Sequence, residues 1–231
     1  MHTGRRLVLA ILFALVLLPG RAVCAADNLQ KVLHDLDTAA ANFHSTTADF
    51  EFVSIETDPV PEQDVQKGVV YYERKGNAFQ MGVHIREVNG KVVPKVLSIS
   101  RGVTRLFEKM LNQVTTFSKA GKYEGYMELG FGAGGKELED KWNIKYLGSE
   151  VIDGVKTERL ELVARDPEIL KMLPRVEIWV DPQRGVSLKQ VFDEGQGQSR
   201  ICRYFNIKTN QPLPDDAFTF KTDSKTQVIN R

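Results

Sequence analysis

The sequence predicts an α+β protein built on one large, curved antiparallel β-sheet of about ten strands, with helices over its concave face. Apolar and polar residues alternate with a period of two in many segments between residues 48 and 207, as they do in strands with one wet face. Turn signals such as Asn89-Gly90 and Asp153-Gly154 separate these segments. Helical segments do not alternate with the strands, which argues against a parallel, nucleotide-binding sheet. A sheet of this size curls, so its apolar face must be covered.

The first 26 residues predict a secretory signal. A basic head precedes an apolar run over residues 7–18, which is too short to cross a bilayer as a helix. A proline and a glycine end the run, and small residues follow where a signal peptidase would cleave. A signal for lipid attachment at Cys24 would need small residues directly before that cysteine. Residues 21–23 are instead Arg-Ala-Val. We therefore expect residues 1–26 to be a signal peptide and residues 27–231 to form one soluble domain in the periplasm.

The predicted elements after the signal are one helix and then a succession of strands. Residues 27–43 place apolar side chains at spacings of three and four, which predicts an amphipathic helix with one buried stripe. The period then changes to two. Strands are predicted at residues 48–52, 70–72, 79–85, 96–100, 104–107, 114–117, 144–151, 156–164, 176–180, 186–192 and 199–207.

Three further helical segments are predicted at residues 123–129, 136–142 and 167–173. The first two flank a glycine-rich stretch, residues 130–135, which we interpret as a flexible connector between helices. This stretch matches part of a phosphate-binding loop. However, Glu137 follows the lysine where a magnesium-binding hydroxyl is needed, and no buried strand precedes the glycines. A nucleotide site is therefore not expected.

The charge balance and the pattern of cysteine, histidine and serine residues argue against several classes of function. The chain has 31 Lys and Arg against 30 Asp and Glu, and the signal peptide carries three of the arginines. This balance gives no excess of positive charge of the kind that binds nucleic acid. Only Cys202 remains after processing, and its position within an alternating segment favours a half-buried strand residue. The histidines lack metal-ligand spacing, and no G-x-S-x-G motif occurs. We expect no metal, no cofactor and no enzymatic activity.

One face of the predicted sheet is rich in apolar and aromatic side chains. Pattern alone fits an ordinary β core, and it also fits an adaptable apolar pocket. The residues concerned are Phe50, Phe52, Val70, Tyr72, Phe79, Met81, Val83, Phe117, Leu160, Leu162 and Phe192.

The order of motifs resembles that of the periplasmic outer-membrane lipoprotein carrier (LolA-like) family. A secretory signal and a helix ending in Phe43-His44-Ser45 precede the strand Ala48-Asp49-Phe50. Residues 66–74 then resemble the family's glycine, apolar strand and basic end, and residues 99–114 resemble a hairpin. Residues 176–181 and 205–220 resemble the closing strands. Each motif is weak, and it is their collinear order over nearly the whole mature chain that carries the resemblance.

The resemblance implies an incomplete β-barrel that is closed by a helical lid and holds the acyl chains of lipoproteins. It implies a monomeric, non-enzymatic carrier between an inner-membrane release complex and an outer-membrane acceptor, with acylated lipoproteins as cargo. The apolar face would then line the cavity. The family's arginine that bonds the lid in the empty state matches Arg74, and we expect the guanidinium to reach lid carbonyls in residues 130–135.

Two other functions remain open at this stage. The same fold could serve a lipid- or lipoprotein-sensing protein that regulates a membrane receptor. A hydrolase or transferase acting on cell-envelope lipids would instead require a polar catalytic cluster inside the cavity.

Overall fold

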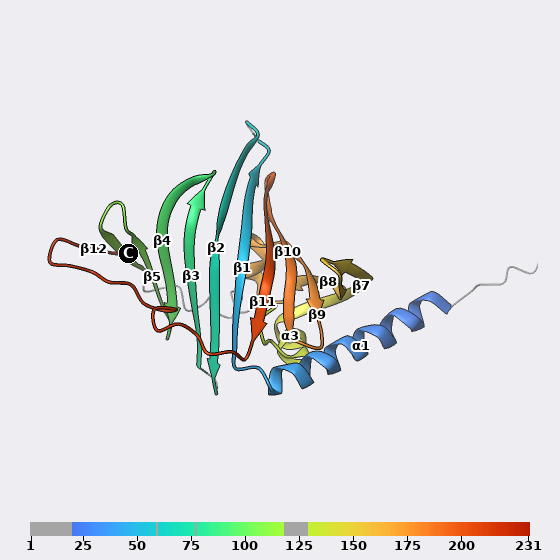
Figure 1. Ribbon diagram of the computed structural model, residues 1–231. Helices are drawn as coiled ribbons and strands as arrows, with labels where there is room; N and C mark the ends of the chain where they lie inside the picture. The colour runs from blue at the N-terminus through green and yellow to red at the C-terminus, as the bar shows by residue number, and fades with distance from the viewer. Residues whose placement is uncertain (1–19, 59, 77, 118–128) are drawn as a thin grey trace, which may run out of the picture.

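One open sheet of 12 strands dominates the structure, a computed structural model that describes residues 20–58, 60–76, 78–117 and 129–231. The strand order is β12-β6-β5-β4-β3-β2-β1-β11-β10-β9-β8-β7. Neighbouring strands pair antiparallel, except that β12 runs parallel to β6. The sheet curls without closing, and helices lie against one end of it (Figure 1). The predicted fold class, an incomplete barrel with helices over it, is confirmed.

The strands extend further than the predicted segments, because alternation weakens near the hairpin ends while backbone pairing continues. The first six are β1 (Ser45–Glu56), β2 (Glu62–Lys75), β3 (Ala78–Val88), β4 (Lys91–Ser100), β5 (Val103–Glu108) and β6 (Gln113–Phe117). The second six are β7 (Trp142–Ile152), β8 (Val155–Ala164), β9 (Arg175–Asp181), β10 (Val186–Gly195), β11 (Gln198–Thr209) and β12 (Gln227–Asn230).

Tight turns hold the hairpins in register. Asn89 and Gly90 have φ values of 50° and 73°, and Asp153 and Gly154 have 50° and 79°. Two successive residues with positive φ make the type I′ turn, whose twist matches that of the flanking strands. The two turns predicted from Asn-Gly and Asp-Gly are therefore present.

Three helices occur in the described part of the chain: α1 (Gly20–Ala41), α3 (Gly135–Lys141) and α4 (Pro167–Met172). They correspond to the predictions at residues 27–43, 136–142 and 167–173. Asp166 caps α4, since its side chain accepts hydrogen bonds from the backbone N–H groups of Glu168 and Ile169. The segment predicted at residues 123–129 lies, up to residue 128, outside the described residues.

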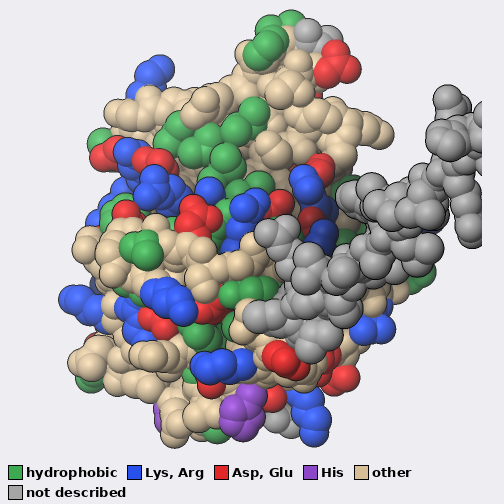
Figure 2. Space-filling view, turned by 90° about the vertical axis from the view of Figure 1, so that its right-hand side faces the viewer, with side chains coloured by type: hydrophobic (Ala, Val, Ile, Leu, Met, Phe, Trp, Pro, Cys, Tyr) green, Lys and Arg blue, Asp and Glu red, His purple; other side chains and the backbone are tan. Residues whose placement is uncertain are grey.

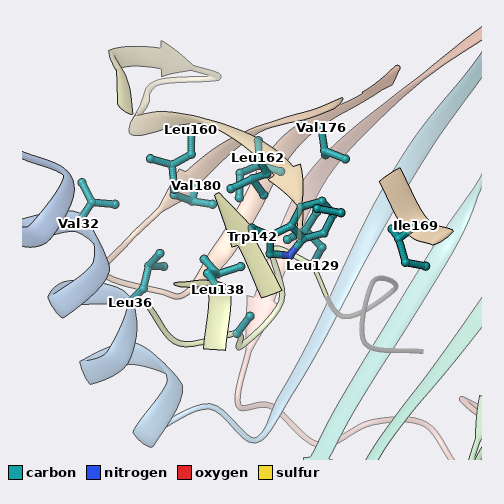
Figure 3. Close-up of a cluster of buried hydrophobic side chains, with 13 residues drawn as sticks. Val32, Leu36, Leu129, Leu138, Trp142, Leu160, Leu162, Ile169, Val176 and Val180 are labelled. Carbon is teal, nitrogen blue, oxygen red and sulfur yellow. The ribbon is translucent and has the colours of Figure 1, made fainter. Parts of the chain in front are cut away.

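Helices α1 and α3 cover the β7–β9 end of the sheet and fill the space above it. Val32 and Leu36 from α1 and Leu138 from α3 point toward Leu160 and Val180 of the sheet (Figure 3). The amphipathic stripe predicted for α1 thus faces the core. Closeness of the helices depends on glycine: a Cβ on Gly135 would lie 2.2 Å from the carbonyl oxygen of Leu33. This end of the sheet is a filled hydrophobic core.

The C-terminal segment crosses the opposite face of the sheet before it adds β12 to the edge. Ala217 packs there against Val69 and Tyr71, and the hydroxyl of Ser98 donates to the carbonyl of Phe218 at 2.8 Å. The strand β12 was not predicted, because it has four residues and its pairing with β6 depends on where this segment leads the chain.

Candidate ligand cavity

A cavity of about 580 Å³ lies on the concave face between β4 and β10, beside the filled core. Its size falls within the range of about 300–1,000 Å³ that is typical of ligand sites. Six adjacent strands and the end of α4 form its walls. The lining residues are Phe50, Phe52, Gln66, Val70, Tyr72, Met81, Val83, Ile85, Leu97, Met172, Leu173, Gln190, Phe192, Glu194, Arg200, Cys202 and Tyr204.

Seven of the eleven apolar residues singled out in the sequence line this cavity, and all seven come from β1, β2, β3 and β10. They are Phe50, Phe52, Val70, Tyr72, Met81, Val83 and Phe192. A period of two places them on one face, and sheet curvature brings them around one space.

The other four residues do not line the cavity. Leu160 and Leu162 are fully buried in the core beneath α1 and α3 (Figure 3), contrary to the expectation that they face a ligand. Phe79 packs beside Tyr72 with ring centres 5.8 Å apart and lines a smaller neighbouring cavity. Phe117 ends β6, where it pairs with Thr104. Alternation identifies a face, but it does not tell which part of that face a helix covers.

An aromatic cluster closes the deep end of the cavity. Phe131 is fully buried, stacks on Tyr72 with ring centres 4.1 Å apart, and meets Tyr204 edge to face at 4.7 Å. The hydroxyl of Tyr204 donates to Gln190, whose amide donates to the carbonyl of Leu129 at 2.5 Å. These bonds satisfy the polar groups that the aromatic cluster buries.

The glycine-rich stretch is a packed structural element and does not form the flexible connector that we expected. Gly130 and Gly132 have φ values of 79° and 71°, and a Cβ on Gly132 would lie 2.3 Å from the ring of Phe43. Backbone bonds fix both sides of Phe131, from Ser187 N–H to the Gly130 carbonyl at 2.6 Å and from Gly132 N–H to the Gly185 carbonyl at 2.9 Å. A single phenylalanine among glycines was the available sequence signal for this anchor.

The Cys202 thiol lines the cavity as an apolar group. Burial raises its pKa to about 12, although a hydrogen bond with Tyr204 acts in the opposite direction. The thiol is therefore protonated at neutral pH and is a poor nucleophile. Its buried place in β11 agrees with the structural role predicted for it.

Arg74 contacts the helical cover, as the resemblance implied, but through a carboxylate. Its Nη1 lies 3.4 Å from Oε2 of Glu137 in α3, and Lys141 donates to Oε1 of the same carboxylate at 2.9 Å. Burial raises the pKa of Glu137, but the bonds and charges of Lys141 and Arg74 outweigh it and lower the pKa overall. The contact is therefore fully charged at neutral pH and is lost as the pH falls below the usual carboxyl range of about 4.3.

The face seen in Figure 2 shows no large patch of one charge, and the described residues hold no cluster of metal ligands. Lys and Arg side chains are interspersed with Asp and Glu on the face seen in Figure 2, and hydrophobic side chains gather in its upper part. No group of three or more His, Cys, Asp or Glu in the described ranges could hold a metal ion. No described helix is long and apolar enough to span a bilayer.

Comparison with known proteins shows the fold. No family profile matches the chain. An uncharacterized protein of Methanocaldococcus jannaschii is 30% identical over 126 residues, which are 54% of this chain and 35% of that protein, so the chain spans about a third of that relative. An uncharacterized conserved protein of Thermus thermophilus has a TM-score of 0.55 at 12% identity, covering 88% of this chain and 99% of that one.

Two further solved structures are similar to the chain. MucB has a TM-score of 0.50 at 13% identity, covering 91% of this chain and 66% of that one. A LolA superfamily protein of Nitrosomonas europaea matches with a TM-score of 0.41 at 16% identity, covering 83% and 97%. The chain thus shares its fold with the Thermus thermophilus protein and with MucB. At these identities the likeness describes the fold and leaves cargo to experiment.

The contrast between core and cavity gives a paired prediction. We expect Leu160→Ala to lower the free energy of unfolding by about 2–5 kcal/mol, because it empties a filled core, while leaving acyl-probe affinity unchanged. Met81→Ala should destabilise less, because its half-buried side chain borders open space, but it should weaken probe binding about five- to thirtyfold through a loss of about 1–2 kcal/mol of apolar contact. Urea unfolding and fluorescence titration measure both quantities. If Leu160→Ala weakened probe binding while Met81→Ala did not, this assignment would be wrong.

Proposed function

We propose that the protein is a non-enzymatic periplasmic carrier that holds the acyl chains of lipoproteins in the concave cavity and takes them from the inner to the outer membrane. The observation that carries this proposal is a ligand-sized apolar cavity that opens beside a filled core in a curved, unclosed sheet. An inner-membrane release complex and an outer-membrane acceptor would be its partners.

Apolar burial provides enough free energy for such a ligand. Each buried methylene contributes about 0.8 kcal/mol, so about ten of them approach the 8.2 kcal/mol that corresponds to micromolar affinity. Release to an acceptor then requires a contact that is regained when the ligand leaves. The Arg74–Glu137 pair is suited to this role, because it joins the end of β2 to the helix that covers the neighbouring core.

The first test measures acyl binding by the intact mature chain. A fluorescent fatty-acyl probe should bind at micromolar concentration and raise the melting temperature, because a ligand that binds only the folded state stabilises it by mass action. Met81→Ala should reduce both effects. Absence of binding and of thermal stabilisation would refute the carrier proposal, whereas capture of one membrane receptor without acyl cargo would favour the sensing function.

Export forms a separate part of the proposal. We expect cleavage between Val23 and Asp27 and no acyl anchor, because residues 21–23 depart from a lipoprotein box. Intact mass of the protein recovered from its own cells tests this, and a diacylglycerol adduct on Cys24 would contradict it.

Arg74→Leu should leave the fold intact and still allow the acyl probe to bind, but it should make transfer to an acceptor unfavourable. The substitution removes a charged hydrogen bond of the kind worth about 1.5–3 kcal/mol, so the empty state, in which α3 is bonded to the end of β2, loses its advantage over the loaded state. Separate assays of uptake and of onward transfer to acceptor vesicles measure the two steps.

Glu137→Gln is the matched variant, since it removes the same charge pair from the side of α3 while Arg74 is retained. The two substitutions should impair transfer to a similar extent. Transfer at the wild-type rate in both variants would assign Arg74 to a surface role only.

A further inference from the structure

A cation lies on the apolar wall of the cavity, where the sequence analysis had placed none. Arg200 in β11 pairs with Phe192 of β10 and with Ser54 of β1. Its guanidinium carbon lies 6.0 Å from the ring centre of Phe52 and 5.8 Å from that of Phe192. Both distances are within the range of a cation–π contact, so two cavity aromatics hold the charge at the ligand space.

The hydrogen-bonding capacity of Arg200 is only partly used. Its Nη2 forms an ion pair with Oε1 of Glu194, which also lines the cavity. Its Nε is buried and has no hydrogen-bond partner among the described residues. A guanidinium has five N–H donors in a planar fork. A buried donor without an acceptor is costly, so an added anionic oxygen at this point would gain a bond that the empty protein lacks.

Arg200 also lies where a ligand can reach it. Its side chain is 40% exposed, although Nε itself is covered. This exposure fits a position at the open end of the cavity, opposite the aromatic cluster. Tyr204, at the closed end, is four residues further along the same strand face, a distance of about 13 Å at the usual rise per residue. An acyl chain between them would have its head beside Arg200 and its tail toward the aromatic cluster.

We propose that Arg200 binds the anionic head group of an amphiphile whose acyl chain occupies the cavity, with Glu194 holding the guanidinium until that ligand arrives. This rests on the proposed acyl-binding function and adds the chemical class of the ligand. The shared chemistry is an anionic oxygen next to an alkyl chain, and a carboxylate and a phosphate are its two sources. Both match the planar fork of arginine bidentately.

The experiment is a calorimetric titration of the intact mature protein with three monomeric amphiphiles of equal chain length: myristate, tetradecyl phosphate and the neutral monomyristoyl glycerol. Wild type is compared with Arg200→Met, which keeps an apolar stem of similar length, and with Glu194→Gln, which removes the competing charge and keeps the shape. Circular dichroism establishes that each variant is folded.

The two variants should act in opposite directions on the anionic probes. Arg200→Met should weaken the tighter-binding anion at least about tenfold, the lower limit for a charged hydrogen bond. Glu194→Gln should strengthen it, because the ligand no longer competes for the guanidinium. Neither variant should change affinity for the neutral probe by more than about twofold. The anion with the larger response identifies the head group as carboxylate or phosphate.

Equal affinity of wild type for all three probes, or equal losses for all three in Arg200→Met, would overturn the head-group proposal and leave acyl binding intact. If Arg200→Met does not fold, the effect of Glu194→Gln decides, and unchanged anion binding overturns the proposal. Failure of every probe to bind wild type would overturn the proposed function as well.

Discussion

The packing of α1 and α3 on one end of a single curved sheet is the constraint on which the rest of the molecule depends. An apolar concave face must be covered, but these helices cover only the β7–β9 end, where Leu138 and Leu160 belong to one filled core. The helices do not fill the space in front of the neighbouring strands, β4 to β10, which hold the cavity. One sheet therefore provides a stable core and a hollow side by side, and the core keeps the curvature that the hollow needs.

Phe131 joins these two regions. It follows Leu129, which belongs to the filled core, and its own ring stacks on Tyr72 at the deep end of the cavity. The same short stretch leads directly into α3, which carries Glu137 opposite Arg74. A shift of Phe131 would thus disturb both the aromatic cluster and the start of α3. The positive φ of Gly130 and Gly132 makes this close path possible, because other residues adopt that conformation only with strain.

Local periodicity and turn signals predicted the strands, the three described helices, the two tight turns and the shared sheet face of the seven residues that line the cavity, since each depends on sequence neighbours. The remaining features depend on contacts between distant segments. Leu160 and Leu162 alternate as cavity residues would, but α1 covers them. The four-residue β12 forms only because a distant segment delivers it to β6. The sequence assigned no role to Arg200, because the contacts of its guanidinium with Phe52 and Phe192 come from strand pairing and sheet curvature.

Arg74 and Arg200, the two arginines assigned a role in the proposals above, lie near opposite ends of β1. Glu73, beside Arg74, pairs with Ser45, whereas Arg200 pairs with Ser54. Nine residues of β1 separate these rows, about 30 Å along the strand. A ligand held at Arg200 therefore reaches the aromatic cluster before it approaches the Arg74–Glu137 contact. Phe131 lies between the two, because it stacks on Tyr72 of the cavity wall and leads into α3, so we expect chains too short to reach the aromatic cluster to leave the Arg74–Glu137 contact undisturbed.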